Sequence, residues 1–137
     1  MYKKIKGQSY YTNRHSCFLL TYHAVLVTKY RNPVLTGAVK ESVYNTIRTI
    51  CEEKNIFILE MNGEPDHVHI LFEAGPDIKP LELMSVLKTK TARFARRDRP
   101  LEVEKHYWEP HFWSNTYFIT TVGGNNLAVV SEYIQNQ

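Results

Sequence analysis

Two histidines stand two residues apart in the short apolar stretch "PDHVHILF", residues 65–72. Side chains alternate between the two faces of a strand, so His67 and His69 project from the same face if this stretch is a strand. Such neighbours are ~6.5–7 Å apart, twice the rise per residue, which lets two imidazole nitrogens converge on one ion. The pair indicates a metal site, unless the two histidines share a strand face by chance.

A third ligand is available in "VSEYIQNQ", residues 130–137. Tyr133 and Gln137 are four residues apart, which places them on one face of a helix. Gln137 offers a carbonyl oxygen to a metal, and Tyr133 offers a phenol one turn away. The alternative is that Tyr133, one of nine tyrosines, only packs its ring against apolar neighbours.

The hydrophobic pattern predicts the elements that must position these residues. In chain order it predicts a strand at 17–28, a helix from 36 to about 54, a strand at 56–61, a strand at 67–72, a helix beginning near Pro80, a strand at 116–122 and a helix at 125–137. Residues 1–14 are expected to form an irregular N-terminal arm, and residues 100–115 an irregular segment. Asn62 and Gly63 are expected to begin the connection between the second and third strands. The whole chain, 1–137, is then one domain.

The first six elements follow the βαββαβ order of the ferredoxin-like α+β fold, an antiparallel sheet with both helices on one face. The apolar face of the third strand should lie under these helices, so the histidines project from the open face. The last helix carries an apolar stripe that also needs a surface: Leu127, Val130 and Ile134. Docking on the open face, in the same subunit or a neighbour's, would carry Tyr133 and Gln137 toward His67 and His69.

The composition is that of one globular domain. The chain has 137 residues, of which 43% are hydrophobic and 23% charged, enough for a core of ordinary size. No apolar run approaches the ~20 residues of a membrane span, and the basic N-terminal stretch lacks a signal-peptide pattern. Cys17 and Cys51 are far apart and have no CxxC partners, which argues against a zinc cluster or disulfide framework and predicts a cytoplasmic protein.

Positive charge is concentrated in one segment. The net charge is only +3, yet residues 79–99 contain seven lysines and arginines against two acidic residues. Lys90, Arg93 and Arg97 are spaced three and four apart, so they form one basic row on the predicted helix. This distribution indicates a polyanionic partner, unless the row is only a solvated helix face.

These motifs resemble the single-tyrosine HUH transposases of bacterial and archaeal insertion sequences. "PDHVHILF" contains the family's histidine, bulky hydrophobe, histidine motif, and "YFITTVGGNNLAVVSEYIQNQ" also resembles the family. "YHAVLVTKYRNPVL", residues 22–35, is similar to its first strand with the following Lys-Tyr-Arg, and "FWSNTYFITTVG" to its fourth-strand region. The resemblance extends from about Tyr22 to Gln137, and four motifs in order in a chain this short are specific.

The resemblance implies a composite active site. His67 and His69 correspond to two metal ligands, Tyr133 to the nucleophile and Gln137 to the third ligand. The family's proteins are homodimers, and in their active form each site takes its tyrosine helix from the partner subunit. They bind single-stranded DNA hairpins near the ends of the element, then cut and rejoin single strands. The sequence stops at Gln137, where relatives commonly run further, so we expect this ligand to lie on a fraying turn.

The implied chemistry is metal-dependent strand transfer through a 5′-phosphotyrosine. Attack by Tyr133 would leave a free 3′-hydroxyl, and the covalent link keeps the energy of the broken bond, so rejoining needs no nucleotide cofactor. Two imidazoles and an amide are neutral ligands, which leave the charge of the ion available to the phosphate. We expect Mg²⁺, with Mn²⁺ supporting activity at least as well. Asp66 either orients a metal-binding imidazole by a hydrogen bond to its other nitrogen or only completes the Pro-Asp turn.

Contacts with DNA are expected from basic and aromatic residues. The candidates for phosphate contacts are Lys29, Arg31, Lys88, Lys90, Arg93 and Arg97. Four aromatic residues either stack on unpaired bases or anchor their segment to the core: Tyr107, Trp108, Phe112 and Trp113. His106 and His111 lack a third partner for a second metal site and are interpreted as loop residues.

Two alternatives to a transposase stay open at this level. A non-catalytic binder of single-stranded RNA or DNA can use the same fold, but an RNA-recognition module would place aromatics on the open face of its third strand, where this chain has His67 and His69. A domesticated relative could process chromosomal repeat hairpins instead of mobilising an element. The flanking DNA would separate that role from transposition.

Overall fold

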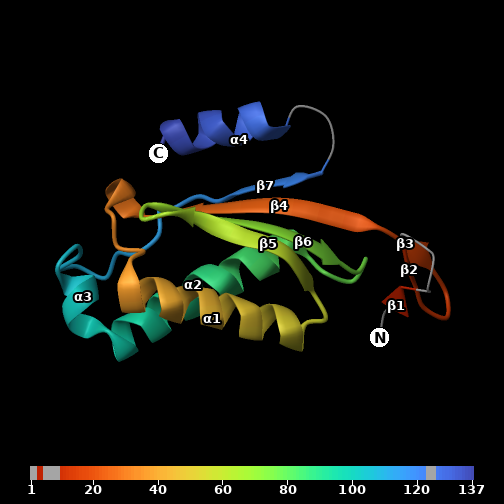
Figure 1. Ribbon diagram of the computed structural model, residues 1–137, viewed down its shortest axis with the longest axis horizontal. Coiled ribbons are helices and arrows are strands. Elements are labelled where there is room, and N and C mark those ends of the chain that lie inside the picture. The colour runs from red at the N-terminus through yellow and green to blue at the C-terminus, as the bar shows by residue number, and fades with distance from the viewer. Residues whose placement is uncertain (1–2, 5–9, 123–125) are drawn as a thin grey trace.

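The computed structural model describes residues 3–4, 10–122 and 126–137 (Figure 1). Its main sheet has four antiparallel strands in the order β5-β6-β4-β7. These strands are β4 (Leu20–Val27), β5 (Phe57–Glu64), β6 (His67–Ala74) and β7 (Phe118–Thr121). Two long helices, α1 (Gly37–Glu53) and α2 (Pro80–Asp98), cover one face of this sheet. The predicted ferredoxin-like α+β fold is confirmed.

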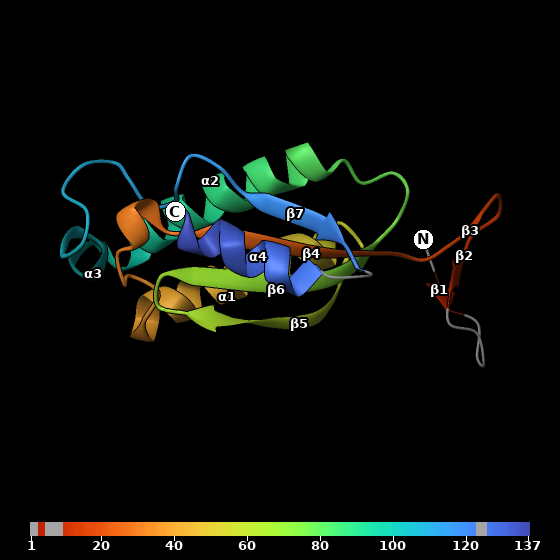
Figure 2. The ribbon, with the colours of Figure 1, turned by 90° about the horizontal axis from the view of Figure 1, so that it is seen from above.

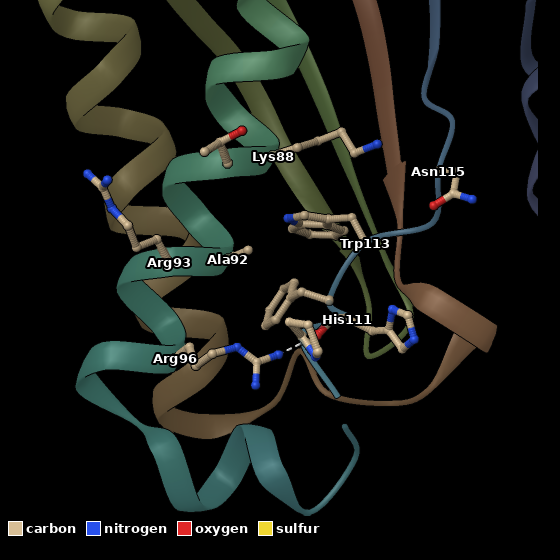
Figure 3. A pocket seen from close by; sticks show the side chains of 10 residues that line it. Lys88, Ala92, Arg93, Arg96, His111, Trp113 and Asn115 are labelled. Atoms are coloured by element: carbon tan, nitrogen blue, oxygen red, sulfur yellow. Dashed lines mark hydrogen bonds between the residues drawn. The ribbon is translucent and has the colours of Figure 1, made fainter. Parts of the chain in front are cut away.

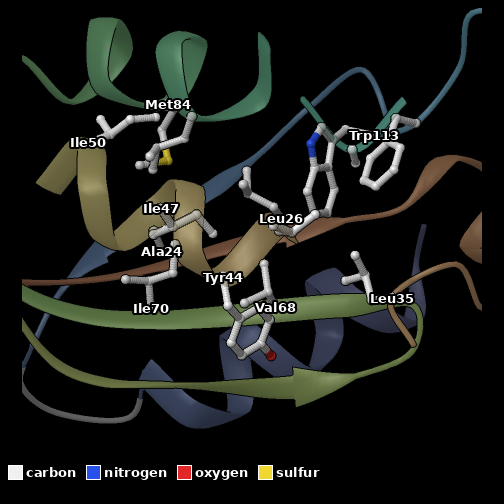
Figure 4. Close-up of a cluster of buried hydrophobic side chains, with 14 of the residues drawn as sticks. Ala24, Leu26, Leu35, Tyr44, Ile47, Ile50, Val68, Ile70, Met84 and Trp113 are labelled. Carbon is white, nitrogen blue, oxygen red and sulfur yellow. The ribbon is translucent and has the colours of Figure 1, made fainter. Parts of the chain in front are cut away.

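The core lies between the sheet and these two helices (Figure 4). Ala24 and Leu26 of β4 and Val68 and Ile70 of β6 are all fully buried, because their side chains alternate onto the helix-covered face. Apolar residues recur at helical spacing on α1 and complete this core, among them Val39, Val43, Ile47 and Ile50. The alternation that buries these side chains sends their neighbours on β4 and β6 to the other face.

A fourth helix, α4 (Asn126–Gln135), lies over that other face (Figures 1 and 2). Ile134 packs with Val25 and Val27 of β4, and the rings of Tyr133 and Phe118 complete this second cluster. The last helix therefore docks on the open face within one subunit, one of the two arrangements that the sequence allows. Of the predicted stripe, the side chains of Leu127 and Val130 lie outside the described part of the chain.

Strands β5 and β6 form the predicted hairpin, but its turn is Pro65–Asp66 and not Asn62–Gly63. Gly63 stays in β5, paired with Val68. A Cβ placed on Gly63 would collide with the backbone oxygen of His67. Glycine is therefore required where two backbones approach this closely, two residues before the turn that leads to the first histidine.

We expect Gly63→Ala to lower the free energy of unfolding by about 2 kcal/mol or more, because the paired backbones must move apart to admit a methyl group. Thermal denaturation followed by circular dichroism measures this change. Gly37→Ala is the comparison, because Gly37 has no atom within 4 Å of an added Cβ, so only its left-handed φ of +50° is strained, by about 1 kcal/mol. Equal destabilisation by the two substitutions would contradict the close approach at Gly63.

Two segments predicted to be irregular contain short regular elements. The N-terminal arm contains β1 (Lys3–Lys4) and β2 (Tyr11–Thr12), which form a small antiparallel sheet with β3 (Cys17–Phe18). β3 is the start of the strand predicted at 17–28, which the structure divides into β3 and β4. The hydroxyl of Tyr11 donates to Glu73 at 2.7 Å, which ties this sheet to β6. Helix α3 (Pro100–Glu104) begins the other segment. Elements of two to five residues are too short for hydrophobic periodicity to reveal.

None of the helices in the described ranges is long and apolar enough to cross a membrane.

Candidate active site

His67 and His69 lie on the face of the sheet that α4 covers. In the β4–β6 ladder His67 is opposite Val27 and His69 is opposite Val25, and both valines pack against α4. Directly opposed residues of an antiparallel pair share a face. The two imidazole rings are 4.8 Å apart between centroids and nearly perpendicular, at 83°.

Asp66 holds the first imidazole in a defined orientation. Nδ1 of His67 lies 2.7 Å from Oδ1 of Asp66, and Nε of Arg31 donates to Oδ2 of the same carboxylate at 3.0 Å. Burial alone would raise the pKa of Asp66, but the hydrogen bonds and charges of His67 and Arg31 hold it below its usual range. An ionised carboxylate only accepts, so Nδ1 of His67 donates to it, and in the neutral imidazole this leaves the lone pair on Nε2.

A third histidine, His23 of β4, contacts the second imidazole. Nε2 of His23 lies 3.1 Å from Nδ1 of His69, and both side chains are partly buried. Burial, followed by the charges of His67 and His23, lowers the pKa of His69 to about 4, so this ring is neutral at pH 7. The sequence places His23 on the same strand face as Val25, but only the register with β6 reveals the contact with His69.

The donor set fits a divalent metal ion. Nδ1 of each imidazole already has a partner, so Nε2 of His67 and Nε2 of His69 are the atoms left to bind a cation. Within the described ranges, His, Cys, Asp and Glu side chains alone form no group of three that could hold a metal. Gln137, which is none of these types, is the third ligand that the sequence offers.

Tyr133 and Gln137 contact the same hydroxyl group, that of Thr116, in the segment leading into β7. The hydroxyl of Tyr133 is 2.7 Å from Oγ1 of Thr116, and its ring lies 5.3 Å from that of Phe118. Oε1 of Gln137 accepts from Oγ of Ser114 at 3.1 Å and from Oγ1 of Thr116 at 3.3 Å. The two residues therefore share one side of the C-terminal turn, as their spacing indicates.

The histidine pair and the two C-terminal residues lie at the same level along the strands but are not in contact. The N–H of Ser114 donates to the carbonyl of Val27 at 2.8 Å, and Val27 is paired with His67. The backbone of Ser114, the partner of Gln137, is thus about two strand spacings from that of His67, or roughly 10 Å. The structure brings the four predicted residues to one face and one end of the sheet, with Gln137 bonded to hydroxyls in this arrangement.

The basic residues of α2 divide between two sides of the helix. Lys88, Arg93 and Arg96 line a pocket of about 290 Å³ that faces residues 110–115 (Figure 3). Burial, and then repulsion from Lys29, lowers the pKa of Lys88.

The other two predicted phosphate contacts on this helix face α1. Lys90 and Arg97 line two separate hollows between the helices, and Nε of Arg97 is paired with Asp98 at 2.8 Å. Arg96 is absent from the sequence prediction of phosphate contacts, although it borders the same pocket as Lys88. The helical phase of residues 88, 92 and 96, four apart, is the signal that could have found it.

The aromatic residues of the segment 105–115 have two environments. Tyr107, Phe112 and Trp113 are buried, and Nε1 of Trp113 donates to Oγ1 of Thr91 at 2.9 Å. Trp108 is 90% exposed. Tyr107, Phe112 and Trp113 therefore anchor the segment to the core, whereas the ring of Trp108 is open to solvent.

A ferredoxin-like sheet with a histidine pair on one strand, covered by a helix that carries a tyrosine, has the architecture of the single-tyrosine transposases. The sequence pattern of the family described as "Transposase IS200 like" matches residues 16–137. The chain belongs to this family.

Individual relatives agree with this assignment. The chain is 30% identical to the ISDra2 transposase TnpA of Deinococcus radiodurans over 96% of this chain and 89% of that protein. It is 32% identical to the transposase for insertion sequence element IS200 of Salmonella typhimurium, over 90% and 80% of the two chains. A crystal structure of a Deinococcus radiodurans R1 protein assigned to the transposases matches with a TM-score of 0.84 and 28% identity, covering 92% and 96% of the chains.

The fold is also that of a more distant protein. The structure of a REP-associated tyrosine transposase bound to a REP hairpin matches with a TM-score of 0.57 and 10% identity, over 88% of this chain and 68% of that one.

Proposed function

We propose that this protein cleaves and rejoins single-stranded DNA at the ends of an insertion sequence, through a 5′-phosphotyrosine formed on Tyr133. Membership of the transposase family implies DNA strand transfer. The observation that carries the finer proposal is that Tyr133 docks on the same sheet face as His67 and His69. The hairpin bound by the REP-associated tyrosine transposase, which shares the fold, supports a DNA hairpin as the partner.

Tyr133 would act as the nucleophile after losing its proton. Its hydroxyl now lies against Thr116, whose own hydroxyl could rotate and donate to the phenolate. Attack forms a bond between the phenolic oxygen and phosphorus and breaks the bond from phosphorus to the 3′ oxygen, which takes up a proton. Attack of a 3′-hydroxyl on the phosphotyrosine reverses these steps and joins two strands.

A divalent cation at this site would offset the negative charge of the phosphodiester and of the leaving oxygen. Nε2 of His67 and of His69 would hold it, and Oε1 of Gln137 would join them after releasing Ser114 and Thr116. Asp66 and His23 would keep the two rings oriented through Nδ1. Mg²⁺ is the proposed physiological ion, and Mn²⁺ should replace it.

We further propose that the active form is a homodimer with composite sites, in which α4 of one subunit completes the histidine pair of the other. This part of the proposal comes from the family resemblance. Within one chain Gln137 is bonded to Ser114, two strand spacings from His67, which is compatible with it.

His23→Ala is expected to weaken Mn²⁺ binding by about 10- to 100-fold, because Nδ1 of His69 loses the partner that fixes its tautomer and orientation. Titration of free Mn²⁺ by electron paramagnetic resonance measures the affinity without DNA. His15→Ala is the control, since His15 is an exposed histidine between β2 and β3, which lie at the opposite end of the molecule from the C-terminus (Figure 1). Wild-type affinity in His23→Ala would exclude His23 from the metal site.

Cleavage of single-stranded DNA tests the proposed function itself. Single-stranded oligonucleotides containing a hairpin and the flanking element end would be mixed with the protein and Mg²⁺ or Mn²⁺. The proposal predicts a protein–DNA adduct that survives denaturant and needs the metal. Binding with no cleavage of any such oligonucleotide would instead support the non-catalytic binder.

The likeness to insertion-sequence transposases at 30% and 32% identity favours mobilisation of an element over processing of chromosomal repeats. The REP-associated protein is only 10% identical. Element ends in the flanking DNA would support the first role.

A further inference from the structure

The turn that follows β4 is strained at two successive residues. Tyr30 has φ 59° and ψ 14°, and Arg31 has φ 55°, so both lie in the left-handed region. Glycine adopts this conformation freely, whereas other residues are disfavoured there by contacts of their Cβ. Such strain persists only where the surrounding structure imposes it, and it concentrates at functional sites.

Three hydrogen bonds hold this turn. The N–H of Lys29 donates to the carbonyl of Phe112 at 2.8 Å, and the hydroxyl of Tyr107 donates to the carbonyl of Lys29 at 2.6 Å. Oγ1 of Thr28 donates to the carbonyl of Asn32 at 2.8 Å. These partners come from the buried segment beyond α3 and from the turn itself, so the backbone around Tyr30 is fixed before any ligand arrives.

The result is a rigidly mounted ring that faces solvent. Tyr30 is 70% exposed. Nζ of Lys29 lies 5.3 Å from the centre of this ring, and the ring of His111 meets it edge to face at 5.8 Å. A flat aromatic surface with a cation beside it is what single-stranded nucleic acid binds through base stacking and phosphate contact.

The position of this ring connects it to the metal site and to the basic pocket. Arg31, the next residue, donates to Asp66, which in turn contacts His67. On its other side His111 lines the pocket that also contains Lys88 and Arg96 (Figure 3). A DNA strand that runs from the pocket to the histidines would therefore pass the ring of Tyr30.

We propose that Tyr30 is a stacking platform for an unpaired nucleobase of the DNA strand to be cut, with Lys29 and Lys88 contacting the adjoining phosphates. The inference rests on the proposed function for the identity of the strand. It assigns to Tyr30 the positioning of the substrate and no part in the bond-breaking step.

Tyr30→Gly removes the ring and keeps the backbone conformation, because glycine adopts a φ of 59° without strain. We expect its melting temperature to equal or exceed that of the wild type. The affinity for a fluorescent oligonucleotide with a hairpin and a single-stranded flank, measured in EDTA, should fall by about tenfold, the effect of losing one base stack. Tyr30→Phe keeps the ring and should bind within about twofold of the wild type.

A scan with abasic nucleotides along the flank makes the test specific. One position should weaken wild-type binding by about tenfold, and the same position should have little effect in Tyr30→Gly, because the two changes remove the same contact. Unchanged affinity in Tyr30→Gly would overturn the proposal. So would an equal abasic effect in both proteins, or a loss of affinity confined to Trp108→Ala, which would assign the platform to the more exposed Trp108.

Failure of the proposed function gives a different result. A wild-type protein that binds the oligonucleotide in EDTA, shows the abasic effect and never cleaves when metal is added contradicts strand transfer while supporting the platform.

Discussion

Replacing Tyr133 with phenylalanine is expected to reduce strand cleavage by roughly four orders of magnitude or more, because the attacking oxygen itself is removed. The variant keeps the ring that packs against Phe118 and beside Ile134, so α4 should stay docked. Cleavage of an end-labelled oligonucleotide under single-turnover conditions gives the rate, and a denaturing gel shows whether the adduct forms.

Thr116→Val is the matched control for this experiment. It removes the hydroxyl that contacts both Tyr133 and Gln137 but leaves the nucleophile in place. We expect a reduction of about tenfold at most, since the hydroxyl only assists. A Tyr133→Phe rate within tenfold of the wild type would exclude Tyr133 as the nucleophile, whatever the result for Thr116→Val.

His67→Ala is expected to abolish cleavage, by at least about a thousandfold, while leaving hairpin binding in EDTA unchanged. The substitution removes one proposed ligand and leaves the carboxylate of Asp66 with Arg31 as its remaining partner. His67 is 9% exposed, so the loss of stability should be checked by thermal denaturation. The measurements are the cleavage rate with Mn²⁺, the Mn²⁺ affinity and the hairpin affinity of the same preparation.

Mixing the two inactive variants extends this prediction to the assembly. In a heterodimer of Tyr133→Phe with His67→Ala, a site built across two subunits receives intact histidines from one chain and Tyr133 from the other. Composite sites therefore predict that activity returns on mixing. Sites built within single chains predict that each stays defective, and a mixture as inactive as its components would contradict the composite arrangement.

The fold could be predicted from the sequence because its strands and helices are long enough to show their periods. The alternation of Val68, His69 and Ile70 identifies both the buried face and the histidine face of β6. Helical spacing on α1 and α2 supplies the other layer. Chain order then leaves few ways to pack these elements, and the ferredoxin-like sheet is one of them.

Features that depend on contacts between distant segments could not be predicted in this way. The bond between His23 and His69 requires the register of two strands 46 residues apart in sequence. The left-handed backbone at Tyr30 is imposed by partners from the segment beyond α3 and leaves no local signal, because neither Tyr30 nor Arg31 is a residue that favours this conformation.

The position of Gln137 illustrates the same limit at the candidate site. Its spacing from Tyr133 correctly indicates a shared side of the helix end, and both residues contact Thr116. The docking of Ile134 on Val25 and Val27 sets the level along the strands at which these two residues lie. The hydroxyls of Ser114 and Thr116 then determine which segment they contact, and the sequence does not single out these two hydroxyls.

Mass spectrometry of the trapped adduct tests the central claim most directly. After cleavage of a hairpin oligonucleotide with Mn²⁺, nuclease and trypsin digestion should leave a nucleotide on the tryptic peptide that begins at residue 106, because residues 106–137 contain no lysine or arginine. This peptide also contains Tyr107 and Tyr117, so fragmentation must locate the added mass. We predict that it lies on Tyr133 and disappears in His67→Ala and in EDTA. A nucleotide on any other residue, or an adduct that persists without the histidine and the metal, would contradict the account.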